Sequence, residues 1–427
     1  MGDNMMERVI HTPEGVRDIY GEECKQKRIV MEELHQILHL YHYEEIKTPT
    51  LEFFDIFSKE KGTAQSNEMF KLFDRENNTL VLRPDMTPSI ARCVSKYFAN
   101  EKHHIRLCYE GQAFQNLSRL QGKLNEFTQL GAELIGDDTS AADGEMISMM
   151  VDCLIAVGLK EFQVSIGHVE YFTGLVEEAG LLPEVADSLR DAIQNKNTYA
   201  IETLCKKAGI KDSLTEAFMN LTKNIGGLEV LEQAKQAVHN ERSLKAIDRL
   251  EKLYHIMTYY EYESHISFDL GMLSNYKYYS GVIFRGYTYG TGSPIAAGGR
   301  YNGLLKQFGV DMPSVGFAFF VDVLLNAMLH QRIVIDTAED ATMILFETPH
   351  QKTAIQLAKF FRSHNQTIQL TRKSSRSTIG EYREHCKMHG LNQIIYVKDS
   401  DDCFERILVE NGASSTVTKD VLKGGAL

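Results

Sequence analysis

The stretch GQAFQNLSRLQGKLNEFTQLGAELIG, residues 111–136, decides the fold. Its second half, FTQLGAELIG, is a short apolar run of the kind that forms β-strands. Gln129 and Glu133 are four positions apart, so in a strand both side chains lie on one face. Similar runs at 80–84 and 105–109 predict neighbouring strands. Residues 67–135 therefore predict an antiparallel sheet with a polar pair on one face.

Helices and further strands are predicted on both sides of this sheet. Residues 22–42 and 141–157 have helical periodicity, whereas 184–260 lose glycine and become rich in Glu, Lys, Ala and Leu. We interpret 184–260 as a helical insertion. Strand patterns return in HISFDLGM (265–272) and YYSGVIFRGYTYG (278–290), and a last helix is predicted over 314–330.

An acidic stretch at 336–340 predicts a linker to a smaller C-terminal part. Strand-like runs then alternate with helical ones, which predicts an α/β domain with a mostly parallel sheet. The predicted elements are strands at 343–346, 367–370 and 393–397 and helices at 351–363 and 378–389. The predicted domains are 1–330, with the insertion at about 184–260, and 341–427.

Composition excludes some classes of protein. The chain has no run of 18 apolar residues, so no membrane span is expected. Its seven cysteines form no C-x-x-C pair, which favours reduced thiols and a cytoplasmic location. The net charge of −12 argues against nucleic acid, whose phosphates are bound by Lys and Arg. Residues 335–427 are neutral, and their basic cluster Arg372, Lys373 and Arg376 is interpreted as a solvated loop.

Several stretches, in order, resemble histidyl-tRNA synthetase, a class II aminoacyl-tRNA synthetase. The resemblance covers about 10–330, apart from the insertion, and continues more weakly in the tail. It implies an α+β fold in which helices flank the antiparallel sheet of a class II synthetase, and a C-terminal domain like an anticodon-binding domain. The matching stretches are TPEGVRDIYGEE (12–23), YHYEEIKTPTLE (41–52), NEMFKLFD (67–74), LRPDMTPSIAR (82–92), residues 111–136, NYKYYSGVIF (275–284), AAGGRYNGLL (296–305) and SVGFAFFVDVLL (314–325).

The resemblance fails where aminoacylation needs cations. Amino-acid activation develops negative charge on the α-phosphate of ATP, and fixed guanidinium groups best hold that charge. At three family arginine positions this chain has Gln115, Val323 and Ser274. Other polar positions of the ATP-binding loop have also changed, to Leu117, Lys123 and Asn125. We therefore expect no catalytic residues.

The amino-acid pocket of the family is better preserved. A histidine site needs carboxylates and amides for the amino group and the ring, and aromatic walls. The resemblance places six residues there: Asp85, Thr87, Gln129, Glu133, Tyr278 and Tyr279. Asp85 stands where the family has Glu, which shortens its reach by one methylene. A buried polar network kept only for packing is the alternative interpretation.

No metal site or cofactor is expected. His35, His39 and His42 lie near one helical face, but no HExxH motif or adjacent carboxylate supports zinc. The glycine-rich AAGGRYNG lacks the Lys-Ser/Thr ending of a phosphate-binding P-loop.

A synthetase-like chain without these arginines resembles the regulatory subunits of ATP phosphoribosyltransferase. That resemblance implies a non-catalytic role in the first step of histidine biosynthesis. It implies activation of a short catalytic subunit in a hetero-octamer, feedback inhibition by histidine, and self-association through the class II dimer interface. Many members of that family end after the class II core, so the tail makes an active histidyl-tRNA synthetase the first alternative. A stand-alone histidine sensor with another partner is the second.

Overall fold

The computed structural model describes residues 11–58, 66–117, 124–273, 278–337 and 340–423. Two compact units are present. The first contains the chain up to Ile19 together with Lys27–Ile335, and the second contains Tyr20–Gln26 together with the chain from Asp336. In the part of the chain that is described, no helix is both long and apolar enough to cross a bilayer.

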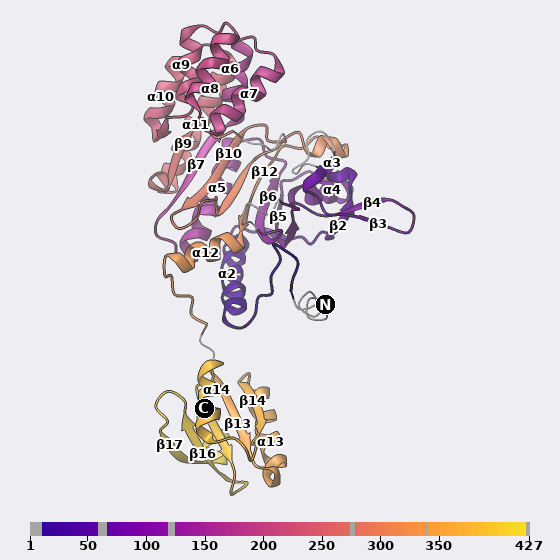
Figure 1. The fold of residues 1–427 in the computed structure, drawn as a ribbon, viewed down its shortest axis with the longest axis vertical. Coiled ribbons are helices and arrows are strands. Elements are labelled where there is room, and N and C mark those ends of the chain that lie inside the picture. The colour runs from indigo at the N-terminus through magenta and orange to yellow at the C-terminus, as the bar shows by residue number, and fades with distance from the viewer. Residues whose placement is uncertain (1–10, 59–65, 118–123, 274–277, 338–339, 424–427) are drawn as a thin grey trace, which may run out of the picture. The chain divides into compact units, whose positions relative to one another are not determined.

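A nine-stranded sheet forms the centre of the first unit (Figure 1). Its neighbours pair antiparallel except β1 with β5 and β7 with β9, which are parallel. The predicted class II-like antiparallel sheet is therefore confirmed. Its order is β1 (Glu44–Glu45), β5 (Ile105–Phe114), β6 (Glu126–Ile135), β12 (Ser314–Phe320), β11 (Ala296–Arg300), β10 (Val282–Thr288), β7 (Phe162–His168), β9 (Ile266–Asp269) and β8 (Ile225–Gly226).

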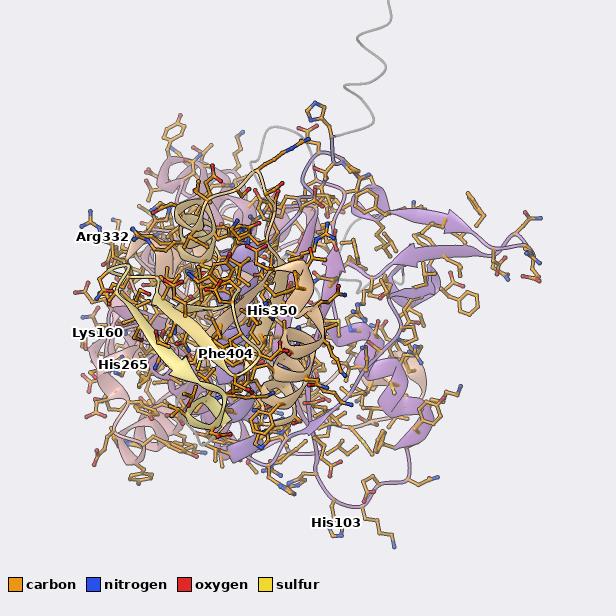
Figure 2. All side chains as sticks on the ribbon, turned by 90° about the horizontal axis from the view of Figure 1, so that it is seen from below. His103, Lys160, His265, Arg332, His350 and Phe404 are labelled. Atoms are coloured by element: carbon orange, nitrogen blue, oxygen red, sulfur yellow. The ribbon has the colours of Figure 1, made fainter. Side chains whose placement is uncertain are left out.

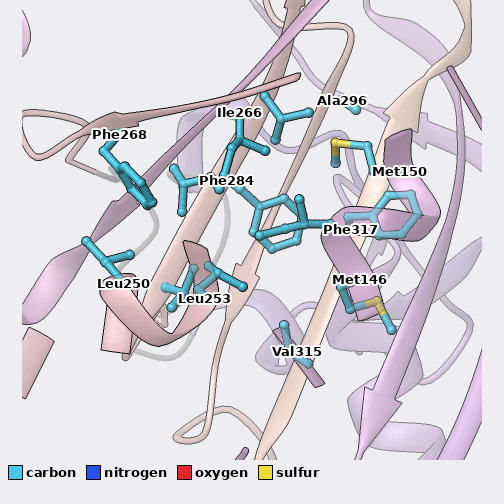
Figure 3. Packing of buried hydrophobic residues seen from close by; sticks show 14 of the residues in the cluster. Met146, Met150, Leu250, Leu253, Ile266, Phe268, Phe284, Ala296, Val315 and Phe317 are labelled. Carbon is cyan, nitrogen blue, oxygen red and sulfur yellow. The ribbon is translucent and has the colours of Figure 1, made fainter. Parts of the chain in front are cut away.

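Strand alternation divides this sheet into two differently packed faces. On β6, Leu130, Ala132 and Leu134 belong to a large apolar core with the helices α5 (Ser140–Ala156) and α11 (Glu241–Tyr259). Figure 3 shows Met146 and Met150 of α5 beside Phe317 in this core. Gln129 and Glu133 lie on the opposite face, where a smaller apolar cluster leaves room for polar groups.

The helical insertion forms a bundle next to β9 and β7, at the upper end of the first unit in Figure 1. Leu250 and Leu253 of α11 pack into the main core (Figure 3), so the insertion shares the interior of the sheet domain. Helix α6 (Val169–Glu178) precedes the predicted insertion at 184–260. The helices of the insertion are α7 (Pro183–Gln194), α8 (Thr198–Lys207), α9 (Asp212–Asn220), α10 (Leu228–Ala237) and α11.

The predicted helix over 314–330 is wrong in its first half. Ser314–Phe320 forms strand β12, and only Val321–His330 forms helix α12. β12 lies between β6 and β11, and its backbone pairs on both sides. The apolar run at 314–320 has a pattern that fits either a helix or a strand. Backbone pairing with both neighbouring strands at the centre of the sheet makes it a strand.

The remaining elements of this unit are a small second sheet, short helices and helix α2. A small sheet has the order β2 (Leu51–Phe53), β4 (Thr79–Leu82) and β3 (Lys71–Phe73). On exposed turns, side chains such as His103 project outward (Figure 2). The other helices are α3 (Asp55–Ser58) and α4 (Thr87–Tyr97), with 3-10 turns at Ser66–Glu68, Glu263–His265 and Leu305–Phe308. Helix α2 (Gly21–Leu40) begins in the segment grouped with the second unit.

The second unit contains a five-stranded sheet. Its order is β14 (Thr367–Arg372), β13 (Ala341–Phe346), β15 (Gln393–Val397), β16 (Cys403–Leu408) and β17 (Ser414–Thr418). The β13 pairings with β14 and β15 are parallel, as predicted, but β16 and β17 add two antiparallel pairings that the sequence analysis missed. Its helices are α13 (Gln351–Ser363), α14 (Ile379–Met388) and α15 (Lys419–Lys423), with a 3-10 turn at Thr348–His350.

Candidate amino-acid-binding site

The polar face of β6 positions the centre of the candidate site. Gln129 and Glu133 point to this face, and Gly316 of β12 is the register partner of Glu133. A Cβ atom on Gly316 would lie 1.6 Å from a carboxylate oxygen of Glu133. Only glycine at this position therefore leaves space for the glutamate side chain between two paired strands.

The structure brings the six predicted residues together. Five of them line one small cavity, and Glu133, with 1% of its surface exposed, is hydrogen-bonded to two residues of the cavity wall. The Thr87 hydroxyl donates to Glu133 Oε1 at 2.8 Å, and the Tyr301 hydroxyl donates to Oε2. The five lining residues are Asp85, Thr87, Gln129, Tyr278 and Tyr279.

Backbone donors hold the other polar groups of the site. The N–H of Met86 donates to Asp85 Oδ1 at 2.8 Å and to Gln129 Oε1 at 3.0 Å. This shared donor fixes the turn before α4 against the sheet. Asp85 and Gln129 are thereby oriented before any ligand arrives.

Burial raises the pKa of both carboxyl groups. It raises the pKa of Glu133 from 4.5 to about 8, although the hydroxyls of Tyr301 and Thr87 oppose the shift. Burial likewise raises the pKa of Asp85, against its hydrogen bonds with Gln129 and the backbone. Desolvation disfavours the charged form, so Glu133 holds a proton at neutral pH in the empty site. An arriving cation would favour loss of that proton.

Tyrosines form the walls of the cavity. The Tyr278 and Tyr279 ring centroids are 4.7 Å apart, and Tyr301 meets Tyr278 edge-on at 6.0 Å. The sequence analysis missed Tyr301, which follows the glycines of AAGGRYNG, because that stretch was compared only with a phosphate-binding P-loop. A tyrosine directly after a glycine-rich strand was the available signal.

In this conformation the cavity volume is only about 30 Å³. That space holds about one or two waters and is too small for an amino acid. The rings of Tyr278 and Tyr279, which are tilted at 47° to each other, or other lining side chains must therefore move before a histidine can enter.

Of the three positions where the resemblance leads one to expect an arginine, Gln115 and Val323 lie in the described part of the chain, and both side chains are uncharged. The side chain of Gln115 donates to the carbonyl of Pro84 at 3.3 Å, and the amide of Asn125 bonds to the backbone of Leu117 and Glu14. Val323 on α12 packs partly buried against the main core. Ser274 and Lys123 lie outside the described residues.

Among the residues described at the cavity wall, none is Lys or Arg. Arg83 is buried nearby, but its guanidinium donates to the backbone carbonyls of Gln112, Thr48 and Pro49. These hydrogen bonds use the guanidinium of Arg83 to hold the backbone in place. The described wall therefore offers hydrogen bonds and aromatic surface, but no positive charge for a developing phosphate anion.

The histidines of α2 meet carboxylates that the sequence analysis did not foresee. One ligand atom from each of His35, His39 and Glu45 lies within 4.8 Å of the others, so the group could hold a metal ion. His35 also faces Glu110 at 3.1 Å. Glu45 belongs to β1, which follows α2 closely in the chain, whereas Glu110 belongs to β5, far from the helix in sequence. The expected lack of a carboxylate near these histidines is wrong.

Known proteins share this architecture. The family model of histidyl-tRNA synthetase matches residues 15–324. An ATP phosphoribosyltransferase regulatory subunit from Acetivibrio thermocellus is 36% identical over 97% of this chain and 98% of the relative. A second regulatory subunit, from Ruminiclostridium cellulolyticum, is 36% identical over 92% of this chain and 93% of that relative's length. The chain belongs to the family of ATP phosphoribosyltransferase regulatory subunits.

Solved structures agree with this family membership. A crystal structure from Bacillus halodurans C, described as an ATP phosphoribosyltransferase regulatory subunit/histidyl-tRNA synthetase, has a TM-score of 0.82 at 32% identity and covers 92% of this chain and 99% of that one. Histidyl-tRNA synthetase from Nostoc sp. PCC 7120 shares the fold with a TM-score of 0.80 at 16% identity, over 97% of this chain and 98% of that one. The coverage of the Acetivibrio relative also shows that the C-terminal tail occurs elsewhere in the regulatory family.

Proposed function

We propose that this chain is a non-catalytic regulatory subunit acting in the first step of histidine biosynthesis. In this proposal it activates a short ATP phosphoribosyltransferase catalytic subunit and makes that partner sensitive to histidine. Family membership supports the role. The observation that carries it is the described cavity wall, which has groups suited to an amino acid and lacks a cation for ATP.

Histidine is the proposed effector and occupies the site of Asp85, Thr87, Gln129, Glu133, Tyr278 and Tyr279. A positively charged α-amino group or imidazolium would sit against Glu133 and Asp85, and Glu133 would lose its proton as the ligand binds. The tyrosine rings must separate to admit it, because the closed cavity is too small. Binding therefore changes the pocket conformation, and inhibition follows if the two assembly states differ in histidine affinity.

We further propose the cytoplasm as location, self-association through the class II dimer interface, and a hetero-octamer with the catalytic subunit. The net charge of −12 supports a protein partner over nucleic acid. The proposed domains remain a class II-like core, 1–330, and an anticodon-binding-like domain, 341–427.

A paired assay tests the proposal. The protein is mixed with a short catalytic subunit from the same source, and phosphoribosyl-ATP formation is measured with and without histidine. ATP–pyrophosphate exchange is measured on the protein alone. We expect stimulation, inhibition by histidine and no exchange. Histidine-dependent exchange without stimulation would show an active synthetase, and histidine binding with no effect on the transferase would show a sensor with another partner.

The variant Glu133→Gln ties inhibition to this pocket. Losing a hydrogen bond to a charged ligand group costs about 1.5–3 kcal/mol, so the half-inhibitory histidine concentration should rise roughly tenfold or more. Glu202→Gln, at an exposed position on α8, is the matched control and should leave it unchanged. Equal inhibition of both variants would place the effector elsewhere.

A further inference from the structure

A larger cavity, of about 450 Å³, lies on the other face of the central sheet. Arg300 lines it, whereas Ala297 on the same strand lines the tyrosine cavity. Residues three apart on a strand point to opposite faces, so the two cavities are separated by the sheet. This second cavity lies between the start of α5, the start of α6 and one side of α11. Its volume is typical of a small-molecule site.

Helix α11 supplies a row of cations to this cavity. Arg242, Lys245, Arg249 and Lys252 all line it, and their spacing of three, four and three residues places them on one helical face. Leu250 and Leu253 of the same helix are fully buried in the main core. The helix therefore presents a cationic side to the cavity while its apolar side anchors it.

Two arginines at the base of the cavity form ion pairs with the buried Asp143 and with Asp138. Arg300 is 2% exposed and pairs with Asp143 at 2.8 Å, while Arg249 pairs with the same carboxylate at 2.7 Å. One buried anion is thus shared between two guanidinium groups. Burial, and to a lesser extent the positive charges of Arg249 and Arg300, lower the pKa of the neighbouring His168 to about 3.

Neutral donors complete the lining. Nδ1 of His168 accepts the N–H of Glu170 at 3.3 Å, so the neutral ring carries its proton on Nε2. Ser280 Oγ accepts the N–H of Asn302 at 2.9 Å, which leaves the hydroxyl proton free to donate. Lys252 has no ion-pair or hydrogen-bond partner in the described part of the chain.

We propose that this cavity binds a small phosphorylated sugar. Five cations line it together with three carboxylates, Asp138, Glu170 and Asp248, and the buried Asp143 pairs with two of these cations. Guanidinium and ammonium groups recognise a phosphate monoester through charge-assisted hydrogen bonds. The carboxylates would repel a polyphosphate, but they accept hydrogen bonds from sugar hydroxyls. This site is independent of the proposed histidine effector and of any transferase partner.

Isothermal titration calorimetry on the full chain at low salt tests this proposal. The probes are ribose 5-phosphate, inorganic phosphate, pyrophosphate and ribose. We expect saturable binding of ribose 5-phosphate, weaker binding of inorganic phosphate and pyrophosphate, and no binding of ribose. Lys252→Ala should weaken ribose 5-phosphate binding about tenfold, because it removes one charge-assisted bond. Lys207→Ala, an exposed lysine on α8 of the same insertion, should leave binding unchanged.

Other outcomes would overturn the assignment. Absence of saturable ribose 5-phosphate binding would exclude the site, and unchanged affinity in both Lys252→Ala and Lys245→Ala would place the ligand elsewhere. Tighter binding of pyrophosphate, or equal binding of inorganic phosphate, would contradict a role for the sugar. Circular dichroism of each variant confirms that the fold is intact, since both lysines are exposed.

Discussion

At the scale of single residues, Glu133 combines the most unusual features of the molecule. Its carboxyl group is buried between paired strands, in space that Gly316 leaves free. Two hydroxyls donate to it, yet burial dominates and raises its pKa. A carboxyl group that is neutral when the site is empty and ionises beside a cation is well suited to sense an amino acid.

The raised pKa of Glu133 predicts how stability depends on pH. Between pH 4.5 and about 8 the folded protein holds a proton that the unfolded chain has lost. The free energy of unfolding should therefore fall as pH rises through this window, by up to about 1.4 kcal/mol per pH unit from this group. Glu133→Gln should remove that contribution, as measured by urea unfolding at pH 5.5, 6.5 and 7.5.

Glu202→Gln is again the comparison, because its side chain is exposed on α8. The contribution of Glu133 is the difference in slope between the two variants. Identical slopes would mean that Glu133 is ionised in the folded protein at neutral pH.

At the scale of elements, the helices begin where local chemistry dictates. Helix α14 starts with a capping box: the Thr378 hydroxyl accepts the N–H of Glu381, and the Glu381 carboxylate accepts the N–H of Thr378. These reciprocal bonds satisfy two donors that a helix start otherwise leaves free. The sequence predicted this helix over 378–389, close to the observed Ile379–Met388.

Removing the cap should loosen this one element. Thr378→Ala should destabilise the start of α14 by about 1 kcal/mol. In the full-length chain, hydrogen exchange of the first-turn amides of α14 should accelerate roughly fivefold for that free energy. Ser375→Ala, at an exposed position in the preceding loop, should not change these rates. Equal protection in both variants would show that tertiary packing alone holds the helix start.

At the scale of the whole molecule, one ion-pair network ties the helical insertion to the sheet. Asp143 of α5 is fully buried and pairs with Arg249 of α11 and Arg300 of β11. Arg300 also donates to the carbonyl of Asp137 at 2.8 Å. Three elements that are far apart in sequence meet at this single carboxylate.

Breaking that network should destabilise the first unit strongly. Asp143→Asn leaves two guanidinium groups, one of them buried, without their shared anion, and such losses cost about 3–5 kcal/mol. Urea unfolding followed by circular dichroism measures the change. Asp187→Asn, in an exposed pair with Arg190 on α7, should cost less than about 1 kcal/mol. A similar small loss in Asp143→Asn would mean that packing alone holds the insertion in place.

The sequence by itself determined the architecture and most positions of the candidate site. Periodicity located the insertion and the strands β5 and β6, and the four-residue spacing placed Gln129 and Glu133 on one face, because strand alternation is a local property. It also predicted three parallel strands of the second unit.

Tertiary structure decided whatever depends on distant partners. Strand β12 formed because β6 and β11 pair with it on both sides, and no local pattern records that pairing. Tyr301 joined the site, and Glu110 approached His35, only through folding. The closed cavity and the raised pKa of Glu133 arise from burial, which is a property of the packed molecule and not of a residue's neighbours in sequence.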